Sequence, residues 1–375
     1  MTQDLFVHGA FVAYVLAFLL GLATVFTWVE RKLSAVMADR IGANRAYLRL
    51  PFTQVKLVCW GLFQGIADGL KMILKENFTP STYDRFCYQV APWLATVPVL
   101  LVFAVVPFGG SVTPGRLFAP GSALATYFGE RSYPMQIASL DAGILFVLAF
   151  SGIGILGTML AGWASNNKFS LLGAARAASQ MISYEISMGL ALIAMVATYG
   201  TLDLNRMVQW QQHAAWGICV QPVALLVFLT ASIAENKRVP FDLPECESEL
   251  VAGYFTEYTS MKMGLFFLSE FIEIVVISAL VVTLFLGGYS VPWLAPAGFV
   301  LPGGMTWELP HLAVVVLQVL AFSLKVFLVG CFQIQVRWTL PRFRFDQLMR
   351  LGWKFLLPIA AVNLVVTAIV RWWTL

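Results

Sequence analysis

Six ionisable side chains fall inside, or at the end of, stretches that are otherwise apolar enough to lie within a membrane. Charged groups there are costly and normally face a protein interior or a water-filled path. Glu270 and Glu273 are three residues apart, so they share one helix face. A carboxyl group that alternates between charged and neutral forms is what a proton relay requires. The six residues are Arg176, Glu185, Glu235, Glu270, Glu273 and Lys325.

Two interpretations of these charges remain open from the residues alone. In the first, they pair across helices, for example Glu185 with Arg176 or Lys325, and only fix the packing. In the second, they line a polar conduit through the membrane. Because carboxylates outnumber cations within the apolar stretches, we favour the conduit.

The segment 236–262 is acidic and aromatic at the same time. Pro240 and Pro244 interrupt helix at its start. A solvated acidic loop would leave its apolar side chains in water, so we expect the loop to be held against another surface. The acids are Asp242, Glu245, Glu247, Glu249 and Glu257, and the apolar side chains between them are Phe241, Leu243, Leu250, Val251, Tyr254, Phe255 and Tyr258.

The metal-binding residue types are scattered. No CxxC pair occurs among the 5 cysteines, and the 3 histidines are far apart in the sequence. Iron–sulfur clusters and structural zinc sites normally need clustered thiolate or imidazole ligands. We therefore predict no metal site and no redox centre in this chain, so that any redox centre near it belongs to a partner.

Composition decides the broad class of protein. Hydrophobic residues make up 59% of the 375 residues and charged residues only 12%, whereas soluble domains carry about a quarter charged residues. The chain is therefore expected to be an integral membrane protein.

Eight apolar stretches are long enough to span a bilayer as helices, which takes roughly 20 residues each. Period-2 alternation is absent, so we predict an all-α polytopic bundle of about eight transmembrane helices with amphipathic surface helices. The first stretch lacks a basic leader and a cleavage site, so it is expected to stay as an anchor. The stretches cover about residues 6–28, 90–108, 140–162, 171–199, 217–235, 263–286, 311–334 and 355–371.

The basic residues are distributed unevenly between the loops. The loops after the first, third, fifth and seventh stretches hold 18 of the 24 Lys and Arg residues, and the other loops and tails hold 4. Cytoplasmic loops carry the excess of Lys and Arg, so both termini are predicted to lie on the periplasmic side.

Three cytoplasmic segments are expected within this single membrane domain of residues 1–375. The loop 29–89 contains a predicted amphipathic surface helix between Pro51 and Glu76, where Asp68, Lys71 and Lys75 recur at helical spacing. The acidic loop 236–262 is the second segment. The third, 337–354, interleaves basic and aromatic residues, which is typical either of membrane anchoring or of a docking surface.

Several long motifs resemble one membrane subunit of respiratory complex I, which is called H in bacteria and 1 in mitochondria. The segment from Ala234 to Glu245 resembles the loop between the fifth and sixth helices of that family. Ala43 stands where the family commonly has Pro, and Asn236-Lys237 stands where it has Thr-Asn. The other similar motifs are Glu30-Arg31-Lys32, Arg40 to Arg45, Ala67 to Lys71, Lys75-Glu76, Gly162 to Lys168, Gln180 to Ile186, Glu257-Tyr258 and Arg342 to Trp353.

The resemblance implies a subunit of a proton-translocating NADH:quinone oxidoreductase. Such a subunit forms the membrane side and entrance of the quinone chamber, with quinone as the substrate. NADH, flavin (FMN) and iron–sulfur clusters are then held only by partner subunits. The implied partners are the hydrophilic connecting arm, the antiporter-like membrane arm and membrane lipid, with no nucleic acid. The implied location is a bacterial plasma (inner) membrane.

The family's functional residues can be carried over position by position. Our hypothesis is that quinone reduction changes the charge in the chamber and shifts the acidic loop, which loads or releases protons on the buried carboxylates. Glu273 joins the proton path because of its spacing from Glu270. The residues near the chamber are Arg31, Asp68, Arg238, Glu247 and Glu249; those of the proton path are Glu185, Glu235, Glu270 and Glu273.

Two other functions remain as alternatives. The nearest is the homologous membrane subunit of an energy-converting hydrogenase or another ferredoxin-linked complex, which lacks NADH input. Its co-purified partners would identify it. The other is a stand-alone secondary transporter, which predicts an internal repeat and discontinuous helices. No such repeat is visible in the sequence.

Overall fold

Long helices dominate the structure, because a helix satisfies its backbone hydrogen bonds internally, as lipid requires. The computed structural model describes residues 2–49, 56–57, 59–116, 128–244, 246–295, 298–300 and 306–374. The α-helices are α1 (Thr2–Met37), α2 (Phe63–Leu74), α3 (Arg85–Val102), α5 (Gly143–Ala164), α6 (Lys168–Tyr199), α7 (Leu204–His213), α8 (Gly217–Val220), α9 (Pro222–Glu235), α10 (Glu247–Leu250), α11 (Ser260–Phe285), α12 (His311–Thr339), α13 (Phe345–Arg350) and α14 (Leu357–Thr374).

The remaining elements are short and lie at the ends of the bundle. Antiparallel pairing joins β1 to β2, β3 to β4, and β5 through β6 to β7. The strands are β1 (Leu48–Arg49), β2 (Lys56–Leu57), β3 (Ser111–Val112), β4 (Tyr133–Pro134), β5 (Leu294–Ala295), β6 (Gly298–Val300) and β7 (Thr306–Glu308). The tight 3₁₀ turns are η1 (Cys59–Gly61), η2 (Phe103–Val105), η3 (Pro114–Arg116) and η4 (Gly253–Phe255), and the wider π-helical segment is η5 (Leu351–Leu356).

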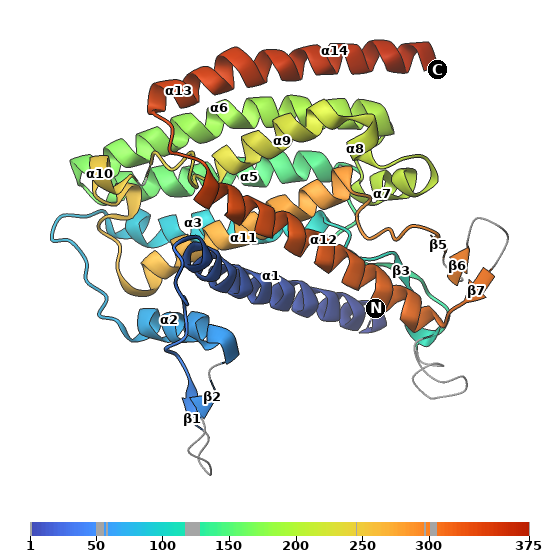
Figure 1. Ribbon diagram of the computed structural model, residues 1–375, viewed down its shortest axis with the longest axis horizontal. Helices are drawn as coiled ribbons and strands as arrows, with labels where there is room; N and C mark the ends of the chain where they lie inside the picture. Colours follow the sequence, from blue (N-terminus) through green and yellow to red (C-terminus); the bar gives the residue numbers. More distant parts are fainter. Residues whose placement is uncertain are drawn as a thin grey trace.

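The predicted polytopic helical bundle is confirmed. Within the described ranges, 7 helical segments are long and apolar enough to cross a membrane. They are built on α1, α3, α5, α6, α11, α12 and the continuous segment from α13 to α14, and they run side by side in Figure 1. Of these, α11 is the most buried and the α13–α14 segment the least.

The predicted fifth span, 217–235, is not one continuous helix. It is divided into α8 and α9, because Pro222 has no N–H and begins a new helix. The Gln221 side chain fills this break by donating to Thr198 Oγ1 at 3.1 Å and to Thr367 Oγ1 at 2.8 Å. The 14 residues of α9 alone are fewer than the roughly 20 that a span needs.

Close packing of α3 against α5 depends on a glycine. A Cβ added at Gly157 would lie 2.5 Å from the backbone nitrogen of Ala95, which a real side chain could not tolerate. The two backbones therefore approach as closely as small-residue contacts allow in membrane helices.

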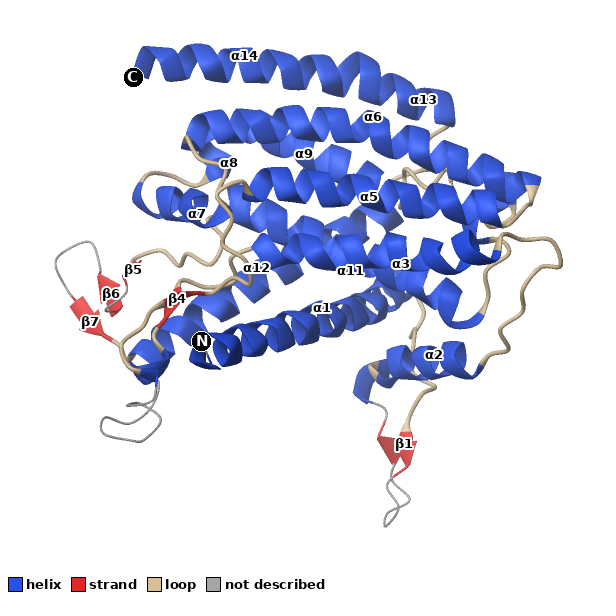
Figure 2. Ribbon diagram, turned by 180° about the vertical axis from the view of Figure 1, so that it is seen from behind, coloured by secondary structure: helices blue, strands red, loops and turns tan. Residues whose placement is uncertain are grey.

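The two ends of the bundle differ in character. Figures 1 and 2 show α2 and α10 at one end, and both termini with β3 to β7 at the other. The loops with the excess of basic residues all lie at the α2–α10 end. Which side of the membrane this end faces stays a prediction.

The surface segments differ in extent from the sequence-based expectation. The amphipathic helix α2 covers Phe63–Leu74 and has no buried residue, whereas the first part of the predicted stretch, residues 50–55, lies outside the described residues. Helix α1 continues to Met37 instead of ending near residue 28. The basic segment 337–354 is mostly helical, because α12 ends at Thr339 and α13 begins at Phe345.

Candidate functional site

A cavity of about 560 Å³ lies between α1, α2, α11 and the start of the acidic loop; we call it the chamber. This volume is within the range of about 300–1,000 Å³ that is typical of small-molecule sites. Its lining is mostly apolar but includes several charged groups. The charged residues that line it are Glu30, Arg31, Asp68, Lys237, Arg238, Asp242, Glu270 and Arg337.

The chamber brings together three of the five residues carried over for quinone binding. Arg31 on α1 forms an ion pair with Asp68 on α2, which joins the surface helix to the bundle. Arg238 lines the same cavity from the acidic loop. Glu249 is not among the lining residues, and the side chain of Glu247 lies outside the described part of the structure.

Glu30 is the centre of a buried charge network at the chamber wall. Its carboxylate accepts from Arg238 Nη1 at 2.6 Å and from Arg337 Nη1 at 2.5 Å. Arg238 also lies 3.6 Å from Glu270 Oε2, and its guanidinium stacks over the Phe271 ring at 4.1 Å. The side chains of Glu30 and Arg238 are only 14% and 10% exposed. The network thus ties α1, α11 and α12 to the loop.

Asp242, which is mostly buried, forms a second ion pair with the more exposed Arg342. Arg342 Nη2 donates to Asp242 Oδ2 at 2.8 Å, and Arg342 Nη1 lies 2.8 Å from Cys246 Sγ. Burial raises the pKa of Asp242 to about 6, although the Arg342 guanidinium opposes that rise. Asp242 therefore titrates close to physiological pH.

Replacing Asp242 with asparagine should flatten the pH dependence of loop stability. Because the folded pKa lies above the ordinary 3.8, the wild-type loop gains stability at low pH and loses it as pH rises through about 6. The change is at most about 3 kcal/mol. Hydrogen exchange of the loop, measured between about pH 4 and pH 7, tests this, with exposed Asp346→Asn as the control. Equal pH dependence in D242N and wild type would contradict the assignment.

The acidic loop is held against the bundle, as expected from its apolar residues. Within the described part of the loop, Phe241, Leu243, Leu250, Tyr254, Phe255 and Tyr258 are buried, and Val251 is exposed. Gln180 on α6 donates to the carbonyls of Ala234 and Phe241 at 2.7 and 2.8 Å. Ser170 Oγ donates to the Tyr254 carbonyl at 2.9 Å, and Phe343 stacks on Phe241.

The charges within the spans do not pair in the way considered from the sequence. Arg176 pairs with Glu249 of the acidic loop at 2.5 Å. Lys325 instead donates to the carbonyls of Leu286, Gly288 and Ser290 at 2.8–3.0 Å, near the end of α11. Glu185 forms no ion pair with any described residue. The interpretation that Glu185 pairs with Arg176 or Lys325 is therefore wrong.

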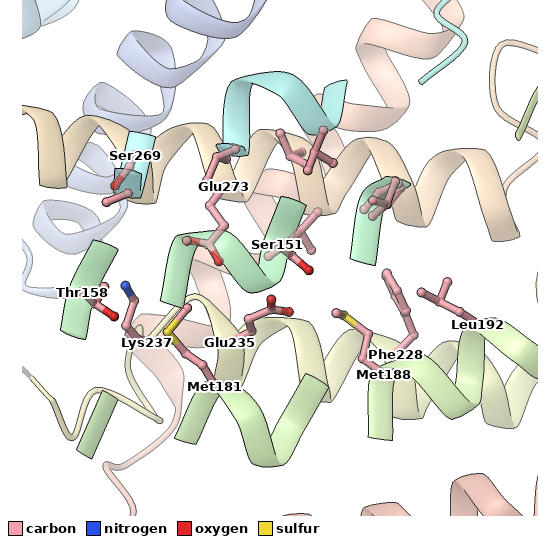
Figure 3. A pocket seen from close by; sticks show the side chains of 18 residues that line it. Ser151, Thr158, Met181, Met188, Leu192, Phe228, Glu235, Lys237, Ser269 and Glu273 are labelled. Atoms are coloured by element: carbon pink, nitrogen blue, oxygen red, sulfur yellow. The ribbon is translucent and has the colours of Figure 1, made fainter. Parts of the chain in front are cut away.

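A second, smaller cavity of about 60 Å³ lies deeper in the bundle; we call it the inner cavity. Figure 3 shows Glu273 and Glu235 pointing into it from opposite sides, with the Lys237 ammonium beside them. The hydroxyl-bearing residues Ser151, Thr158 and Ser269 also line it.

Three of the four predicted proton-path carboxylates line one of the two cavities, and Glu185 lines neither. Glu270 lines the chamber, whereas Glu273 and Glu235 line the inner cavity. Glu185 lies close enough to Glu235 to interact with it electrostatically. Tyr254 donates a long hydrogen bond of 3.5 Å to Glu270 Oε1, so the loop contacts the carboxylate that stands between the cavities.

Several of these residues were not identified as site residues from the sequence: Glu30, Lys237, Asp242, Tyr254, Arg337 and Arg342. Glu30 was assigned to a loop because the first span was expected to end near residue 28. Continuation of the apolar pattern through Val29, Leu33 and Val36 is the signal that could have placed Glu30 inside the helix. Within the described ranges, no three His, Cys, Asp or Glu residues are grouped to hold a metal ion.

Comparisons with known proteins match almost the whole chain. A family model described as NADH dehydrogenase matches residues 10–368. The NADH-quinone oxidoreductase H subunit of Flavobacterium psychrophilum is 42% identical over 360 residues, covering 95% of this chain and 94% of that protein. An H subunit of Cytophaga hutchinsonii is 42% identical, with 93% and 92% covered, and one of Geobacter sulfurreducens is 42% identical, with 97% and 96% covered. The chain is thus a multi-pass membrane protein that belongs to the NADH dehydrogenase family.

Proposed function

We propose that this chain is the membrane subunit of a proton-pumping NADH:quinone oxidoreductase that forms the membrane side and entrance of its quinone chamber. One observation carries the proposal. A cavity of ligand size, lined by a charge network, adjoins a smaller cavity that is lined by two carboxylates. Substrate chemistry in the first cavity can therefore act on protons in the second.

The chamber suits a quinone because it combines an apolar wall with hydrogen-bond donors. Ile73, Met261 and Phe267 offer an apolar surface to an isoprenoid tail. The guanidinium groups of Arg31 and Arg238 supply donors for the head group's oxygens. Helix α2 exposes Ile66 and Leu70, so the quinone enters from lipid beside α2.

Coupling follows from the contacts between the two cavities. Reduction of a neutral quinone to a neutral quinol takes up two electrons, which partner subunits deliver, and two protons. Protons taken from groups around the chamber leave those groups more negative next to Arg238. Arg238 lies against Glu270, and Glu273 is three residues further along α11. The loop that carries Arg238 and Tyr254 contacts both sites, so its position can respond to the chamber and to the carboxylates. Glu235 and Glu185 continue the proton path.

The partners follow from the same assignment. Other subunits bind NADH and hold FMN and the iron–sulfur clusters, and they deliver the electrons. The hydrophilic arm docks at the α2–α10 end of the bundle, and an antiporter-like arm extends within the membrane. The assignment places the complex in the bacterial inner membrane, with both termini on the periplasmic side.

Glu235→Gln and Glu273→Gln should each reduce coupled quinone reductase activity and proton pumping at least about tenfold. NADH oxidation by an artificial acceptor that takes electrons before the quinone should be unchanged. The native complex in membrane vesicles is the sample, and Glu308→Gln, an exposed change at the opposite end of the bundle, is the matched control. Wild-type pumping in both variants would exclude the proposed proton path.

A second measurement tests the quinone chamber itself. A photoreactive quinone should label peptides from α1, α2 or α11, and excess substrate quinone should prevent the labelling. Labelling confined to other helices would contradict the chamber assignment. The subunits that co-purify with the chain distinguish the two candidate complexes, because an energy-converting hydrogenase would contain no NADH-oxidising flavoprotein.

A further inference from the structure

Lys237 lies at the boundary between the chamber and the inner cavity and lines both of them. It follows the last residues of α9, and its backbone has a φ of 55°, which non-glycine residues rarely adopt. Only 5% of the residue is exposed. The side chain is therefore fixed between the cavities rather than extended into solvent.

The Lys237 ammonium has few protein contacts for a buried charge. Its Nζ lies 5.2 Å from the centre of the Tyr254 ring. Among the described residues, it has no hydrogen-bond acceptor and no ion-pair partner within 4 Å. An ammonium group has three N–H donors, and a buried charge without hydrogen bonds is very unfavourable. Water inside the cavities can satisfy those donors.

The inner cavity can supply the missing acceptors as water. Its volume of about 60 Å³ is roughly twice the share of one water molecule in the liquid, about 30 Å³. Ser151, Thr158 and Ser269, together with the two carboxylates, give such waters the two to four polar partners that buried water needs. Figure 3 shows the Lys237 nitrogen directed into this space.

The charges around Lys237 are mainly negative. Helix α9 contributes Glu235, α11 contributes Glu270 and Glu273, and α6 contributes Glu185. The neighbouring cation, Arg238, is already bound to Glu30 and near Glu270, whereas α3 and α5 present only uncharged side chains to the inner cavity. Among the described residues that line the inner cavity, Lys237 is the only cation.

We infer that Lys237 is a positioning residue that links the two cavities: its ammonium donates to water in the inner cavity and balances the charge of Glu235 and Glu273. Quinone reduction in the chamber then acts on the carboxylates through a cation that borders both spaces. The inference rests on the proposed function, because it assumes that Glu235 and Glu273 carry protons.

Lys237→Met in the native complex should lower coupled quinone reductase activity about tenfold and move its pH–rate profile about 1 unit to higher pH. Loss of the neighbouring positive charge favours proton uptake at the carboxylates. Lys237→Arg should keep the wild-type pH profile, because it keeps the charge. Lys168→Met, which removes an exposed lysine at the same end of the bundle, is the matched control.

The Arg variant separates an electrostatic role from a structural one. Arginine is larger than lysine and would disturb packing more than methionine does, so a structural role predicts the greater change in Lys237→Arg. Identical pH profiles for Lys237→Met and wild type would overturn the inference, and so would equal shifts in both Lys237 variants. If Glu235→Gln and Glu273→Gln also retain pumping, the proposed proton path fails too; if they lose it, only the role of Lys237 fails.

Discussion

Replacing Glu30 with alanine should destabilise the subunit by about 3–5 kcal/mol and nearly abolish its assembly. Glu30 accepts from both Arg238 and Arg337, and all three side chains are largely withdrawn from solvent. Without the carboxylate, the two guanidinium groups remain close together, and Arg238 still lies 3.6 Å from Glu270. A buried ion pair contributes little on its own, but removing one partner leaves charges that water cannot solvate.

The amount of assembled complex in native gels and its thermal stability measure this effect. Glu30→Gln should be milder than Glu30→Ala, because the amide oxygen still accepts one hydrogen bond. Glu76→Ala, which removes an exposed acid beyond α2, serves as the control. If Glu30→Ala assembled to wild-type levels with unchanged thermal stability, the network would not stabilise the junction of α1, α12 and the loop.

The helical bundle could be predicted from the sequence because its signals are local. Each run of apolar residues, and each loop rich in Lys and Arg, can be recognised within a short stretch of the sequence. The break at Pro222 was missed, since hydropathy averaged over 217–235 is insensitive to one residue without an N–H.

The site depends on contacts that no local pattern contains. Glu30 is separated from Arg238 by 208 positions and from Arg337 by 307. Composition predicts that buried acids need partners, but it cannot assign them. Arg176 shows the difficulty, since it pairs with Glu249 of the loop instead of a carboxylate within the spans.

The Glu270–Glu273 pair shows how far helical spacing can be taken. Three residues along a helix correspond to about 300° of rotation, so the two side chains diverge by about 60°. That angle suffices for Glu270 to line the chamber and Glu273 the inner cavity. The spacing predicts neighbouring positions on the helix, but the boundary between two cavities is a tertiary feature that spacing does not contain. Whether both carry protons stays a prediction.

Gly173→Ala should destabilise the complex by about 2 kcal/mol and reduce quinone reductase activity several-fold. A Cβ at Gly173 on α6 would lie 2.7 Å from the Cα of Gly253 and 2.9 Å from the nitrogen of Tyr254. These are backbone atoms, so the loop must move as a unit. The shift would break the hydrogen bond that Ser170 Oγ donates to the Tyr254 carbonyl and would separate the Tyr254 hydroxyl from Glu270.

Gly189→Ala on the same helix is the matched control for this effect. Nothing lies within 4 Å of a Cβ at Gly189, so the substitution should be neutral or should stabilise α6 by up to about 1 kcal/mol. The same amino-acid change is therefore expected to lower the stability of the complex at one position of α6 and to preserve or raise it at another. Thermal unfolding and quinone reductase assays on the purified complex measure both. Equal stability and activity of the two variants would show that loop docking against α6 does not control the chamber.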